Sequence, residues 1–517
     1  MTSLRESLSY EPVELGFGTS GLRGLVTDMT DLECYINSAG FLRFLQDTSQ
    51  IKAGDTVYLA GDLRNSTPRI LAAVVHAIED RGYSVGYGGL IPTPAIAHFA
   101  LHHNAASIMV TGSHIPADRN GIKFYKVGGE ILKSDEAAIK EAVAAERERL
   151  YIQPSVESIF VDDGSISNKT NQLPVVISDI SDTYFTRYSE TFPNFLLQGK
   201  KIVVYQHSAV GRDLLAQLLV TLGAEVVTVG RSEVFVSIDT ENVTPTDQAY
   251  FKSIAAENEG VFAIVSTDGD SDRPFVIDEN GTFHRGDELG AVVAAWLKVD
   301  FVAIPVSSND AVDQFLKDND IAYVHTKIGS PYVIEAMSAA TLEGKKRVAG
   351  WEVNGGFLLG SDFDVYNSQL STLATRDAFF PIIAALASAC ERSVSISELF
   401  SQLPSRFTQA GLIDNFSVDT SKKIVQTIQA DSPENRTLLS VYFTDEDGFD
   451  EIIAINVLDG IRIYFANGDI AHLRPSGNAP QMRVYSVASS QQRADEIVEL
   501  GIREDGILTR LAAEFQS

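Results

Sequence analysis

Three aspartates alternate within one short segment and could bind a hard cation together. Asp268, Asp270 and Asp272 lie in the run Ser-Thr-Asp-Gly-Asp-Ser-Asp-Arg-Pro at 266–274, directly after an apolar, β-branched stretch. Carboxylates at alternate positions of a loop can converge, and their oxygens are the ligands that magnesium prefers. Arg273 in the same run can donate two parallel hydrogen bonds to a phosphate. The segment therefore predicts a magnesium site that also holds a phosphoryl group.

Three other interpretations of this segment are open from the residues alone. Counting Asp268 as the first position of an EF-hand loop places Glu279 twelfth, but Arg273 then replaces the glycine at position six and a strand precedes the loop. A strand that ends in Asp-x-Asp is also typical of phosphatases that form an aspartyl phosphate, with Asp268 as the nucleophile. An acidic loop that binds no metal is the third interpretation.

A second segment offers a nucleophile. Residues 111–123 read Thr-Gly-Ser-His-Ile-Pro-Ala-Asp-Arg-Asn-Gly-Ile-Lys and follow another β-branched run. The glycine, proline, aspartate and asparagine residues predict a tight loop that lifts Ser113 and His114 out of the sheet edge. A serine presented in this way can carry a transferred group. It can equally be the N-cap of an ordinary strand-to-helix connection.

Two glycine-rich segments could contact a sugar or an anion. Residues 350–357, Gly-Trp-Glu-Val-Asn-Gly-Gly-Phe, predict a turn whose Glu352 and Asn354 suit hydrogen bonds to sugar hydroxyls. Near the N-terminus, Arg23 belongs to the glycine-rich run 16–24 and is a candidate anion contact. Each segment, considered alone, is also compatible with an ordinary surface loop.

A further candidate phosphate site lies near the C-terminus. Arg474 and Arg483 bracket a turn formed by Ser476, Gly477 and Asn478. The backbone N–H groups of such a turn can form an anion nest, and the two guanidinium groups can clamp a phosphate.

These segments need strands and helices to position them. Nearly continuous apolar runs recur, each followed by a turn and a helical pattern, at 56–60, 107–111, 201–205, 261–265 and 301–306. Such runs predict α/β domains whose sheets are covered on both faces. The apolar run 378–390 is too short to span a bilayer and contains Pro381, so it predicts a buried helix.

The pattern changes near residue 400. Beyond residue 435, strands with polar alternation are expected at 438–442, 460–465 and 481–485, followed by a terminal helix from about Ser490. This order predicts a smaller α+β domain. With the polar stretch 162–172 as a linker, the expected domains are three similar α/β sandwiches at 1–165, 166–285 and 286–400, and an α+β domain at 401–517.

Composition limits the partners. The 517 residues include 41 lysines and arginines against 69 aspartates and glutamates, a formal net charge of −28 at pH 7. We therefore expect no general binding to nucleic acid or anionic membranes. The first residues lack the apolar core of a secretory signal, and the two cysteines, Cys34 and Cys390, form no disulfide framework, which favours a cytoplasmic location. No seam or apolar stripe indicates an oligomeric state.

Taken together and in this order, the segments resemble the α-D-phosphohexomutase superfamily of phosphoglucomutases, phosphomannomutases and phosphoglucosamine mutases. The similarity covers nearly the whole chain, from Phe-Gly-Thr-Ser-Gly-Leu-Arg at 17–23, through 61–67 and 92–94, to Arg-Pro-Ser-Gly at 474–477. The resemblance implies a four-domain, heart-shaped molecule in which each domain contributes one loop to a central active site.

The resemblance also implies roles for individual residues. Ser113 would be the phosphoserine and a magnesium ligand beside Asp268, Asp270 and Asp272. Catalytic roles would fall to Ser113, His114, Lys123 and Arg23. Substrate contacts would come from Arg273, Glu352, Asn354, Arg474, Ser476, Gly477, Asn478 and Arg483.

The implied reaction interconverts hexose 6-phosphate and hexose 1-phosphate through a hexose 1,6-bisphosphate, which would also be an activator. The Trp-Glu-Val-Asn-Gly-Gly loop is most similar to bacterial phosphomannomutases, which favours mannose. Glucose, another hexose, or a catalytically silent sugar-phosphate binder are the alternatives.

Three departures from the family pattern affect these roles. The sugar loop of most members reads Gly-Glu-x-Ser-Gly-His, but here Asn354 and Gly356 replace the serine and the histidine. Asn478 and Ala479 stand where the family usually has Thr-Glu, and the run 326–330 lacks a histidine that some members have. Because the sugar-loop histidine is absent, we expect Lys123 or His114 to take or give the hydroxyl proton.

Overall fold

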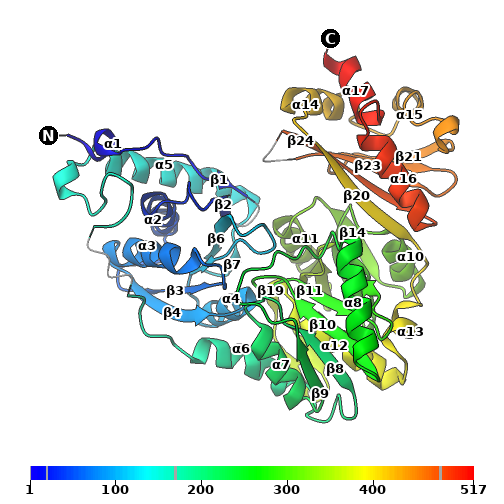
Figure 1. Ribbon diagram of the computed structural model, residues 1–517, viewed down its shortest axis with the longest axis horizontal. Coiled ribbons are helices and arrows are strands. Elements are labelled where there is room, and N and C mark those ends of the chain that lie inside the picture. The colour runs from blue at the N-terminus through cyan, green and yellow to red at the C-terminus, as the bar shows by residue number, and fades with distance from the viewer. Residues whose placement is uncertain (1, 19–20, 168–171, 477–479, 517) are drawn as a thin grey trace. The chain divides into compact units, whose positions relative to one another are not determined.

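The computed structural model describes residues 2–18, 21–167, 172–476 and 480–516, and the chain forms two compact units (Figure 1). The first unit consists of Met1–Val302 and Gly329–Phe400, and the second of Ala303–Ile328 and Ser401–Ser517.

The N-terminal part of the first unit is built on a seven-stranded sheet of order β1-β2-β6-β5-β3-β4, with β7 paired to β6. Strands β4, β3 and β5 are parallel, and the other pairs are antiparallel. The strands are β1 (Gly16–Phe17), β2 (Gly21–Leu25), β3 (Thr56–Gly61), β4 (Ser84–Leu90), β5 (Ser107–Val110), β6 (Arg119–Lys126) and β7 (Gly129–Glu130). The helices are α1 (Leu4–Ser7), α2 (Asp31–Asp47), α3 (Thr67–Asp80), α4 (Thr93–His102) and α5 (Glu136–Ile152), with 3₁₀ turns η1 (Lys133–Asp135) and η2 (Ser155–Glu157).

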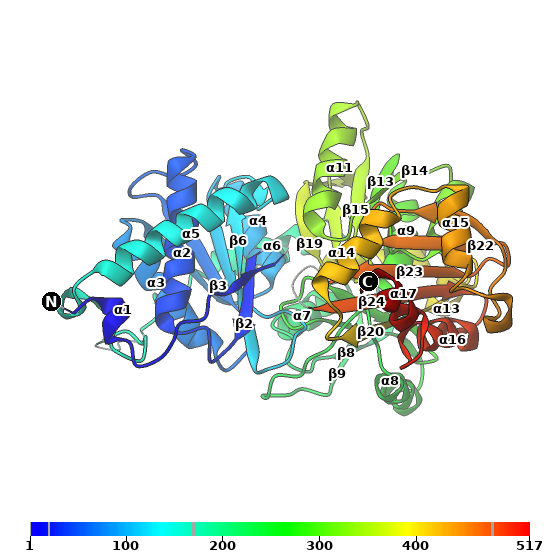
Figure 2. The same ribbon diagram turned by 90° about the horizontal axis from the view of Figure 1, so that it is seen from above.

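The core of this part lies between the sheet and helices α2, α3 and α5. Phe41 of α2 stacks on Phe124 of β6 with ring centroids 4.5 Å apart. On its other side α2 lies against α5 (Figure 2), and a Cβ at Gly40 would come within 2.5 Å of the Val143 side chain. The glycine therefore allows the two helices to approach closely.

The next part of the first unit has a five-stranded sheet of order β12-β11-β10-β8-β9. Its strands are β8 (Lys201–Tyr205), β9 (Glu225–Val229), β10 (Val261–Thr267), β11 (Pro274–Ile277) and β12 (Phe283–His284), and its helices are α6 (Asp179–Ser189), α7 (Arg212–Thr221) and α8 (Pro245–Glu257). Strands β9, β8 and β10 are parallel, whereas β11 returns antiparallel to β10. The connection between β10 and β11 contains the alternating aspartates.

The last part of the first unit contains an antiparallel series β15-β16-β19 and the small pair β17-β18. These strands are β15 (Val348–Trp351), β16 (Phe357–Leu359), β17 (Phe363–Val365), β18 (Ser368–Leu370) and β19 (Leu373–Asp377). The helices are α9 (Gly286–Leu297), α11 (Ser330–Leu342), α12 (Phe379–Arg392) and α13 (Ile396–Phe400). Helix α12 confirms the predicted buried helix, and Pro381 lies in its first turn, where a missing N–H costs nothing.

The second unit is built on an antiparallel sheet of order β20-β24-β23-β22-β21. Its strands are β20 (Phe407–Asp414), β21 (Ile452–Asn456), β22 (Ile461–Phe465), β23 (Ile470–Pro475) and β24 (Gln481–Ala488). Its helices are α14 (Val418–Thr427), α15 (Pro433–Ser440), α16 (Gln491–Ile502) and α17 (Ile507–Gln516), with the 3₁₀ turn η3 (Asp445–Asp447). The unit also includes α10 (Asp310–Asp318) and β14 (Ala322–Thr326), and β13 (Phe301–Pro305) runs from the first unit into it.

The fold confirms the predicted class, with α/β sheets followed by an α+β C-terminal part. Strands β22 and β24 and helix α16 correspond to predicted elements, but the strand expected at 438–442 is wrong. Residues 433–440 form α15 because the Ser432 side chain accepts a hydrogen bond from the Asn435 N–H and Pro433 occupies the first turn.

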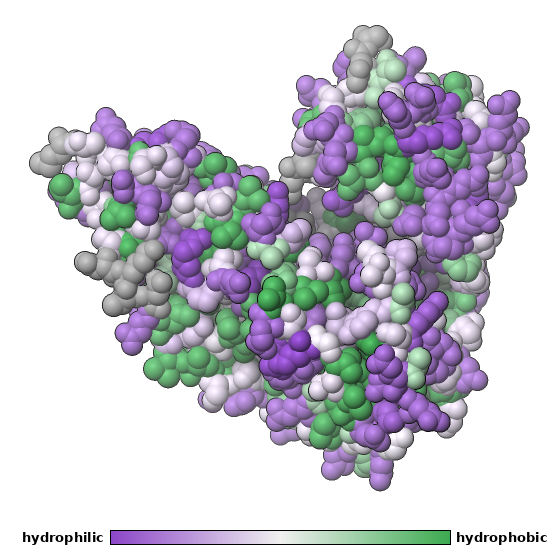
Figure 3. Space-filling model, viewed as in Figure 1, coloured by the Kyte–Doolittle hydropathy of each residue, from purple (hydrophilic) through white to green (hydrophobic). Residues whose placement is uncertain are grey.

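The surface agrees with the composition. On the face that Figure 3 shows, hydrophobic residues are scattered among hydrophilic ones. Within the described part of the chain, no helix combines the length and the apolar composition needed to cross a bilayer.

Candidate active site

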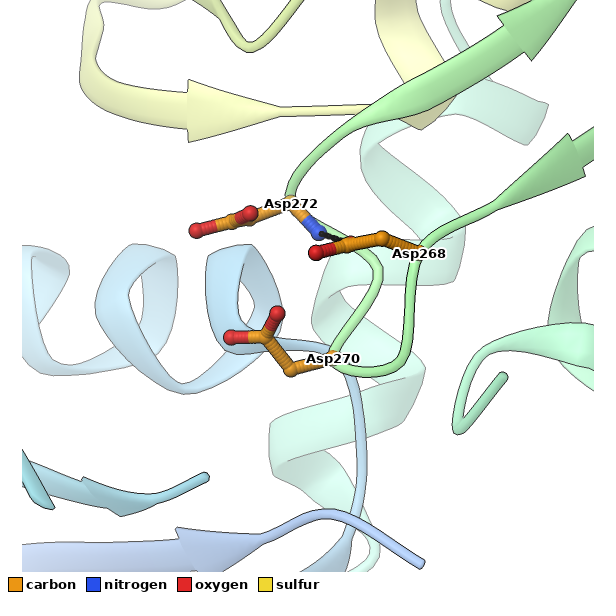
Figure 4. Close-up of side chains that lie close together, drawn as sticks. All are labelled: Asp268, Asp270 and Asp272. Atoms are coloured by element: carbon orange, nitrogen blue, oxygen red, sulfur yellow. Dashed lines mark hydrogen bonds between the residues drawn. The ribbon is translucent and has the colours of Figure 1, made fainter. Parts of the chain in front are cut away.

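The three alternating aspartates face one another across a tight loop between β10 and β11 (Figure 4), called the metal loop here (residues 268–273). The backbone N–H groups of Asp272 and Arg273 both donate to Asp268 Oδ1, each over 3.2 Å. Asp268 thus closes the loop that contains it. Because β11 begins at Pro274, the EF-hand interpretation, which needs a helix on each side of the loop, is wrong.

The metal loop concentrates negative charge away from water. The three aspartates are at most 1% exposed, and one oxygen from each lies within 4.8 Å of the others. Oδ1 of Asp270 and Oδ1 of Asp272 are buried and accept no hydrogen bond from the described residues. Such oxygens cost free energy unless something binds them, and a hard cation is the chemical match. The residues present therefore fit a metal ion.

Two cations from other strands partly balance this charge. Lys123 of β6 donates from Nζ to Asp270 Oδ2 over 2.6 Å and to Asp272 Oδ2 over 2.5 Å. Arg376 of β19 donates from Nε to Asp272 Oδ2 over 3.0 Å. Burial alone would raise the pKa of Asp272, but Arg376, Lys123 and Arg273 outweigh it and hold that pKa below its usual range. Burial and the other two aspartates instead raise the pKa of Asp268 well above its usual range.

Ser113 lies against the metal loop. Its Oγ donates to Asp268 Oδ2 over 2.6 Å and lies 3.3 Å from His114 Nδ1. Ser113 lies in the predicted loop beyond the end of β5, where it is only 1% exposed and packs beneath the metal loop. A Cβ at Gly269 would lie 2.6 Å from the Ser113 carbonyl oxygen, so glycine permits this approach. The N-cap interpretation is wrong, since the segment leads from β5 into β6.

A buried arginine that the sequence analysis did not single out shapes the Ser113 loop. Arg64 is 2% exposed and pairs with Asp62 through Nε at 3.2 Å. Its two terminal nitrogens donate to the backbone carbonyls of Ser113, Ile115, Pro116 and Arg119. Ser113 has φ +55, in the left-handed region. The arginine fixes the carbonyls around that unusual conformation.

Arg23 and His114 share an electropositive environment. Arg23 lies on β2 opposite Gly121 of β6, so it is on a strand instead of the flexible loop expected from the sequence. Its side chain is exposed, but partial desolvation and the charges of Arg273 and Arg376 lower its pKa to about 10, which leaves it protonated at neutral pH. Burial lowers the pKa of His114 well below its usual range, and the positive charges of Arg273 and Arg23 lower it further.

Arg273 is buried but loosely held. Its Nε lies 3.9 Å from Asp268 Oδ2 and 3.8 Å from Asp272 Oδ1, and this nitrogen makes no hydrogen bond within the described residues. Distances of this length are ion pairs without hydrogen bonds. The Arg273 guanidinium therefore has donor capacity available for an anion.

The predicted sugar-binding segment is a hairpin turn between β15 and β16, called the sugar loop here (residues 352–356). Glu352 accepts from Arg376 Nη1 at its Oε2 over 2.9 Å. The Asn354 side chain is used inside the protein: Oδ1 accepts from the Gly356 N–H over 3.0 Å, and Nδ2 donates to Glu241 over 3.2 Å. Glu352 is thus the polar group of this turn that is linked to the metal loop, through Arg376.

Sequence reasoning missed Arg376. Its guanidinium, 6% exposed, joins a carboxylate of the metal loop to one of the sugar loop. The available signal was an Arg-Asp pair at the end of the run Leu-Ala-Thr-Arg-Asp, residues 373–377, because a charged pair in a buried strand usually has a specific partner.

The phosphate-binding candidates lie in the second unit. Arg474 of β23 and Arg483 of β24 are directly opposite each other in the ladder. Like charges in that position repel, so an anion bound between them would be favoured. Arg474 Nε pairs with Asp459 Oδ2 over 3.1 Å, and the Ser476 N–H donates to the Gln481 carbonyl over 2.9 Å. Gly477 and Asn478 lie outside the described residues.

Comparison with known proteins agrees with this arrangement. Three segments match the phosphoglucomutase/phosphomannomutase alpha/beta/alpha domains: domain I at 14–150, domain II at 182–281 and domain III at 285–407. The curated phosphomannomutase of Salmonella muenchen is 41% identical over 94% of this chain and 94% of that protein. The chain belongs to the phosphoglucomutase/phosphomannomutase family.

Two further relatives extend the comparison. A phosphomannomutase of Sinorhizobium fredii is 40% identical over 94% of this chain and 98% of its own length. The solved structure of a phosphoglucomutase/phosphomannomutase family protein from Burkholderia thailandensis covers 96% of this chain and 97% of its own, with a TM-score of 0.69 at 18% identity, which shows the shared fold. The domain boundaries expected at 165, 285 and 400 stay predictions.

Proposed function

We propose that this protein is a phosphomannomutase that interconverts mannose 6-phosphate and mannose 1-phosphate through a phosphoserine at Ser113. The observation that carries the proposal is the 2.6 Å hydrogen bond from Ser113 Oγ to Asp268 Oδ2. It joins the candidate nucleophile of the first sheet to the metal loop of the second. The two phosphomannomutases that are 40–41% identical to this chain support mannose as the sugar.

We propose that the cation is magnesium, held by Asp268, Asp270, Asp272 and an oxygen of phosphorylated Ser113. When bound there, magnesium would neutralise negative charge on the phosphoryl group and so make it a better electrophile. The unpartnered Oδ1 atoms of Asp270 and Asp272 support this assignment.

The remaining residues of the site stabilise and place the transferred group. Arg273 and Lys123, with Arg23 beside them, supply positive charge where the phosphoryl oxygens must lie. In the first half-reaction the bond between phosphorus and Ser113 Oγ breaks, and a bond forms from phosphorus to the free hydroxyl oxygen of the hexose monophosphate. His114 takes the proton of that hydroxyl, or Lys123 takes it after passing its own proton to one of the two aspartates that it contacts. The product is a bound hexose 1,6-bisphosphate.

The second half-reaction uses the other phosphate of that intermediate. The bisphosphate turns end for end, and its second phosphoryl group passes to Ser113, while the same base returns a proton to the freed sugar oxygen. Glu352 and Asn354 of the sugar loop, and the clamp formed by Arg474, Ser476, Gly477, Asn478 and Arg483, would have to accept both orientations. Added hexose 1,6-bisphosphate would act as an activator because it can rephosphorylate a free Ser113.

Phosphorus NMR tests the proposal. Purified protein is mixed with magnesium, a trace of hexose 1,6-bisphosphate, and either mannose 1-phosphate or glucose 1-phosphate. We expect conversion to the 6-phosphates, faster for mannose, and its loss in Ser113→Ala. The matched control is Ser107→Ala, which removes a buried serine hydroxyl from the start of β5, the strand that leads to Ser113.

Each possible result has a clear meaning. Conversion of glucose 1-phosphate at the higher rate would replace mannose by glucose, and no conversion of either sugar would refute the mutase. Turnover that persists in Ser113→Ala would refute the phosphoserine. Wild-type rates in both Lys123→Ala and His114→Ala would refute the proposed proton carriers.

A further inference from the structure

Gly356 and Arg376 lie against each other where the sugar loop enters β16. A Cβ at Gly356 would lie 2.7 Å from both Cγ and Cδ of Arg376 and 2.9 Å from its Cβ. Gly356 is not among the residues with positive φ, so its backbone conformation does not demand glycine. The residue type is instead required by the volume that the Arg376 side chain occupies.

The space left by Gly356 lets the Arg376 guanidinium connect two loops. Its Nε donates to Asp272 Oδ2 over 3.0 Å, and its Nη1 donates to Glu352 Oε2 over 2.9 Å. A guanidinium is planar and rigid, so two such bonds fix the separation and orientation of the two carboxylates more closely than a lysine ammonium would.

The strand end that carries Arg376 is itself fixed on both sides. Asp377 accepts hydrogen bonds from Tyr184 over 2.6 Å and from Tyr188, both on α6. Thr375 donates to Glu130 Oε1 over 2.7 Å. These buried contacts come from two other parts of the first unit, so the position of Arg376 is defined by the fold and not only by its two carboxylate partners.

We infer that Arg376 is a positioning residue of the reaction, which holds Glu352 of the sugar loop in register with Asp272 of the metal loop, and that Gly356 exists to give it room. The inference rests on the proposed function. Phosphoryl transfer requires the sugar hydroxyl to lie within reach of the phosphoserine. Small displacements between the two loops would therefore lower the rate of transfer. Arg376 acts through Glu352 and Asp272 in this account.

Kinetics of Arg376 variants form the first part of the test. We expect Arg376→Ala to lower kcat by about a hundredfold with a much smaller change in KM, because placement and not affinity is lost. Added guanidinium ion should restore part of the rate. Arg376→Lys should recover less than the guanidinium does, since one ammonium cannot make both bonds in the same geometry.

Calorimetric binding of Mn²⁺ separates positioning from mere structural support. Removing a cation 3.0 Å from Asp272 should leave Mn²⁺ affinity equal to that of the wild type or higher. Retained Mn²⁺ binding with lost turnover supports the inference. Parallel loss of metal binding and turnover in Arg376→Ala would overturn it, because Arg376 would then only maintain the metal loop.

A double-mutant cycle with Gly356 completes the test and does not depend on Arg376→Ala alone. Gly356→Ala should lower kcat about tenfold in the wild type by displacing Arg376, and less in Arg376→Ala, where the contacts to Cγ and Cδ are gone and only the 2.9 Å contact to Cβ remains. Gly360→Ala, directly after β16, is the matched control, because a Cβ there would meet no atom of the described residues closer than 3.0 Å.

The outcomes distinguish this inference from the proposed function. A wild-type protein that converts no hexose phosphate refutes the function itself. An active wild type with unchanged kcat in Arg376→Ala, or with equal effects of Gly356→Ala in both backgrounds, refutes only the role of Arg376.

Discussion

The metal loop and the sugar loop are both buried turns between antiparallel strands, but their charges are balanced in opposite ways. In the metal loop three carboxylates lie together, and two of their oxygens have no partner among the described residues. In the sugar loop Glu352 is paired with Arg376 at 2.9 Å, and Asn354 is bonded within the protein. One loop needs an additional cation, whereas the other is already satisfied.

This difference indicates what each loop is for. A buried cluster of like charges is destabilising by itself, so its retention indicates a ligand that completes it. A satisfied turn gains nothing from a metal and instead presents groups of fixed orientation. We therefore expect changes in the metal loop to act on metal and phosphoryl chemistry, and changes in the sugar loop to act on the placement of the sugar.

The largest expected effect comes from Asp270→Asn. It removes a proposed metal ligand, and the charge stabilisation supplied by a bound cation is worth several kcal/mol, so turnover should fall by about a thousandfold or more. Excess chelator should abolish wild-type turnover equally. The measurement is the rate of conversion of mannose 1-phosphate with saturating magnesium.

Controls for Asp270→Asn separate chemistry from folding. The asparagine can still accept from Thr93 and Lys123, and it relieves repulsion among the aspartates, so the metal-free variant should unfold at a denaturant concentration no lower than the wild type. Asp320→Asn, an exposed site, is the matched control for the same chemical change. Full activity of Asp270→Asn, or of the wild type in chelator, would contradict the metal role.

Glu352→Gln tests the other side of the comparison. Glutamine keeps an oxygen that can accept from Arg376 but lacks the negative charge that holds the side chain against the guanidinium. Turnover should therefore fall by about a hundredfold, because the sugar is misplaced. Mn²⁺ affinity measured by calorimetry should change little. The exposed Glu343→Gln at the end of α11 is the matched control. A loss of metal binding as large as that in Asp270→Asn would erase the distinction between the loops.

The sequence revealed the parts of the site that are local in the chain. The metal loop is one run of alternating aspartates, and the Ser113 loop is one cluster of turn residues, so both could be recognised without the fold. The ion pair of Lys123 with Asp270 joins positions separated by 147 residues, and no local pattern predicts it. Arg376 and Arg64 also have partners that are distant in the chain, 104 residues away at Asp272 and 49 residues away at Ser113, so their roles were missed.

Most of the strands predicted from their sequence pattern are present, but the one expected at 438–442 is not. The apolar strands β8 and β10 are evident from their β-branched runs. The run Leu-Leu-Ser-Val-Tyr at 438–442 resembles a strand because it is mostly apolar and contains valine and tyrosine, whereas the helix start at Ser432 and Pro433 decides the conformation. Capping residues carried the stronger signal there.

His207, which contacts the residue before the metal loop, makes the folding stability depend on pH. Its Nε2 bonds to the carbonyl of Thr267, the residue before Asp268, over 2.7 Å, and its Nδ1 is buried without a partner in the described chain. Burial, with a contribution from Arg212, lowers the pKa of His207 to about 4. The unfolded chain therefore binds a proton near pH 6.5 that the folded protein resists until about pH 4, so stability falls as the pH decreases through that window.

Denaturant unfolding at pH 7 and pH 5 measures this contribution. We expect His207 to account for about 2 kcal/mol of the loss in unfolding free energy between the two pH values. His207 has φ +28, a positive value that asparagine tolerates. His207→Asn should be less stable at pH 7 but lose about 2 kcal/mol less on acidification. An identical pH dependence in both proteins would show that His207 does not titrate in this way.

The smallest expected effect compares two buried serines of neighbouring position. Ser107 is 0% exposed, and its Oγ has no hydrogen-bond partner within the described residues, whereas Ser113 Oγ donates to Asp268. An unsatisfied buried hydroxyl costs free energy, so Ser107→Ala should leave turnover unchanged and raise the unfolding free energy by about 1 kcal/mol or less. Ser113→Ala should remove turnover while changing stability little. If Ser107→Ala instead lowered turnover as Ser113→Ala does, loss of a buried hydroxyl beside the loop would explain both results, and the contact with the metal loop would no longer distinguish Ser113.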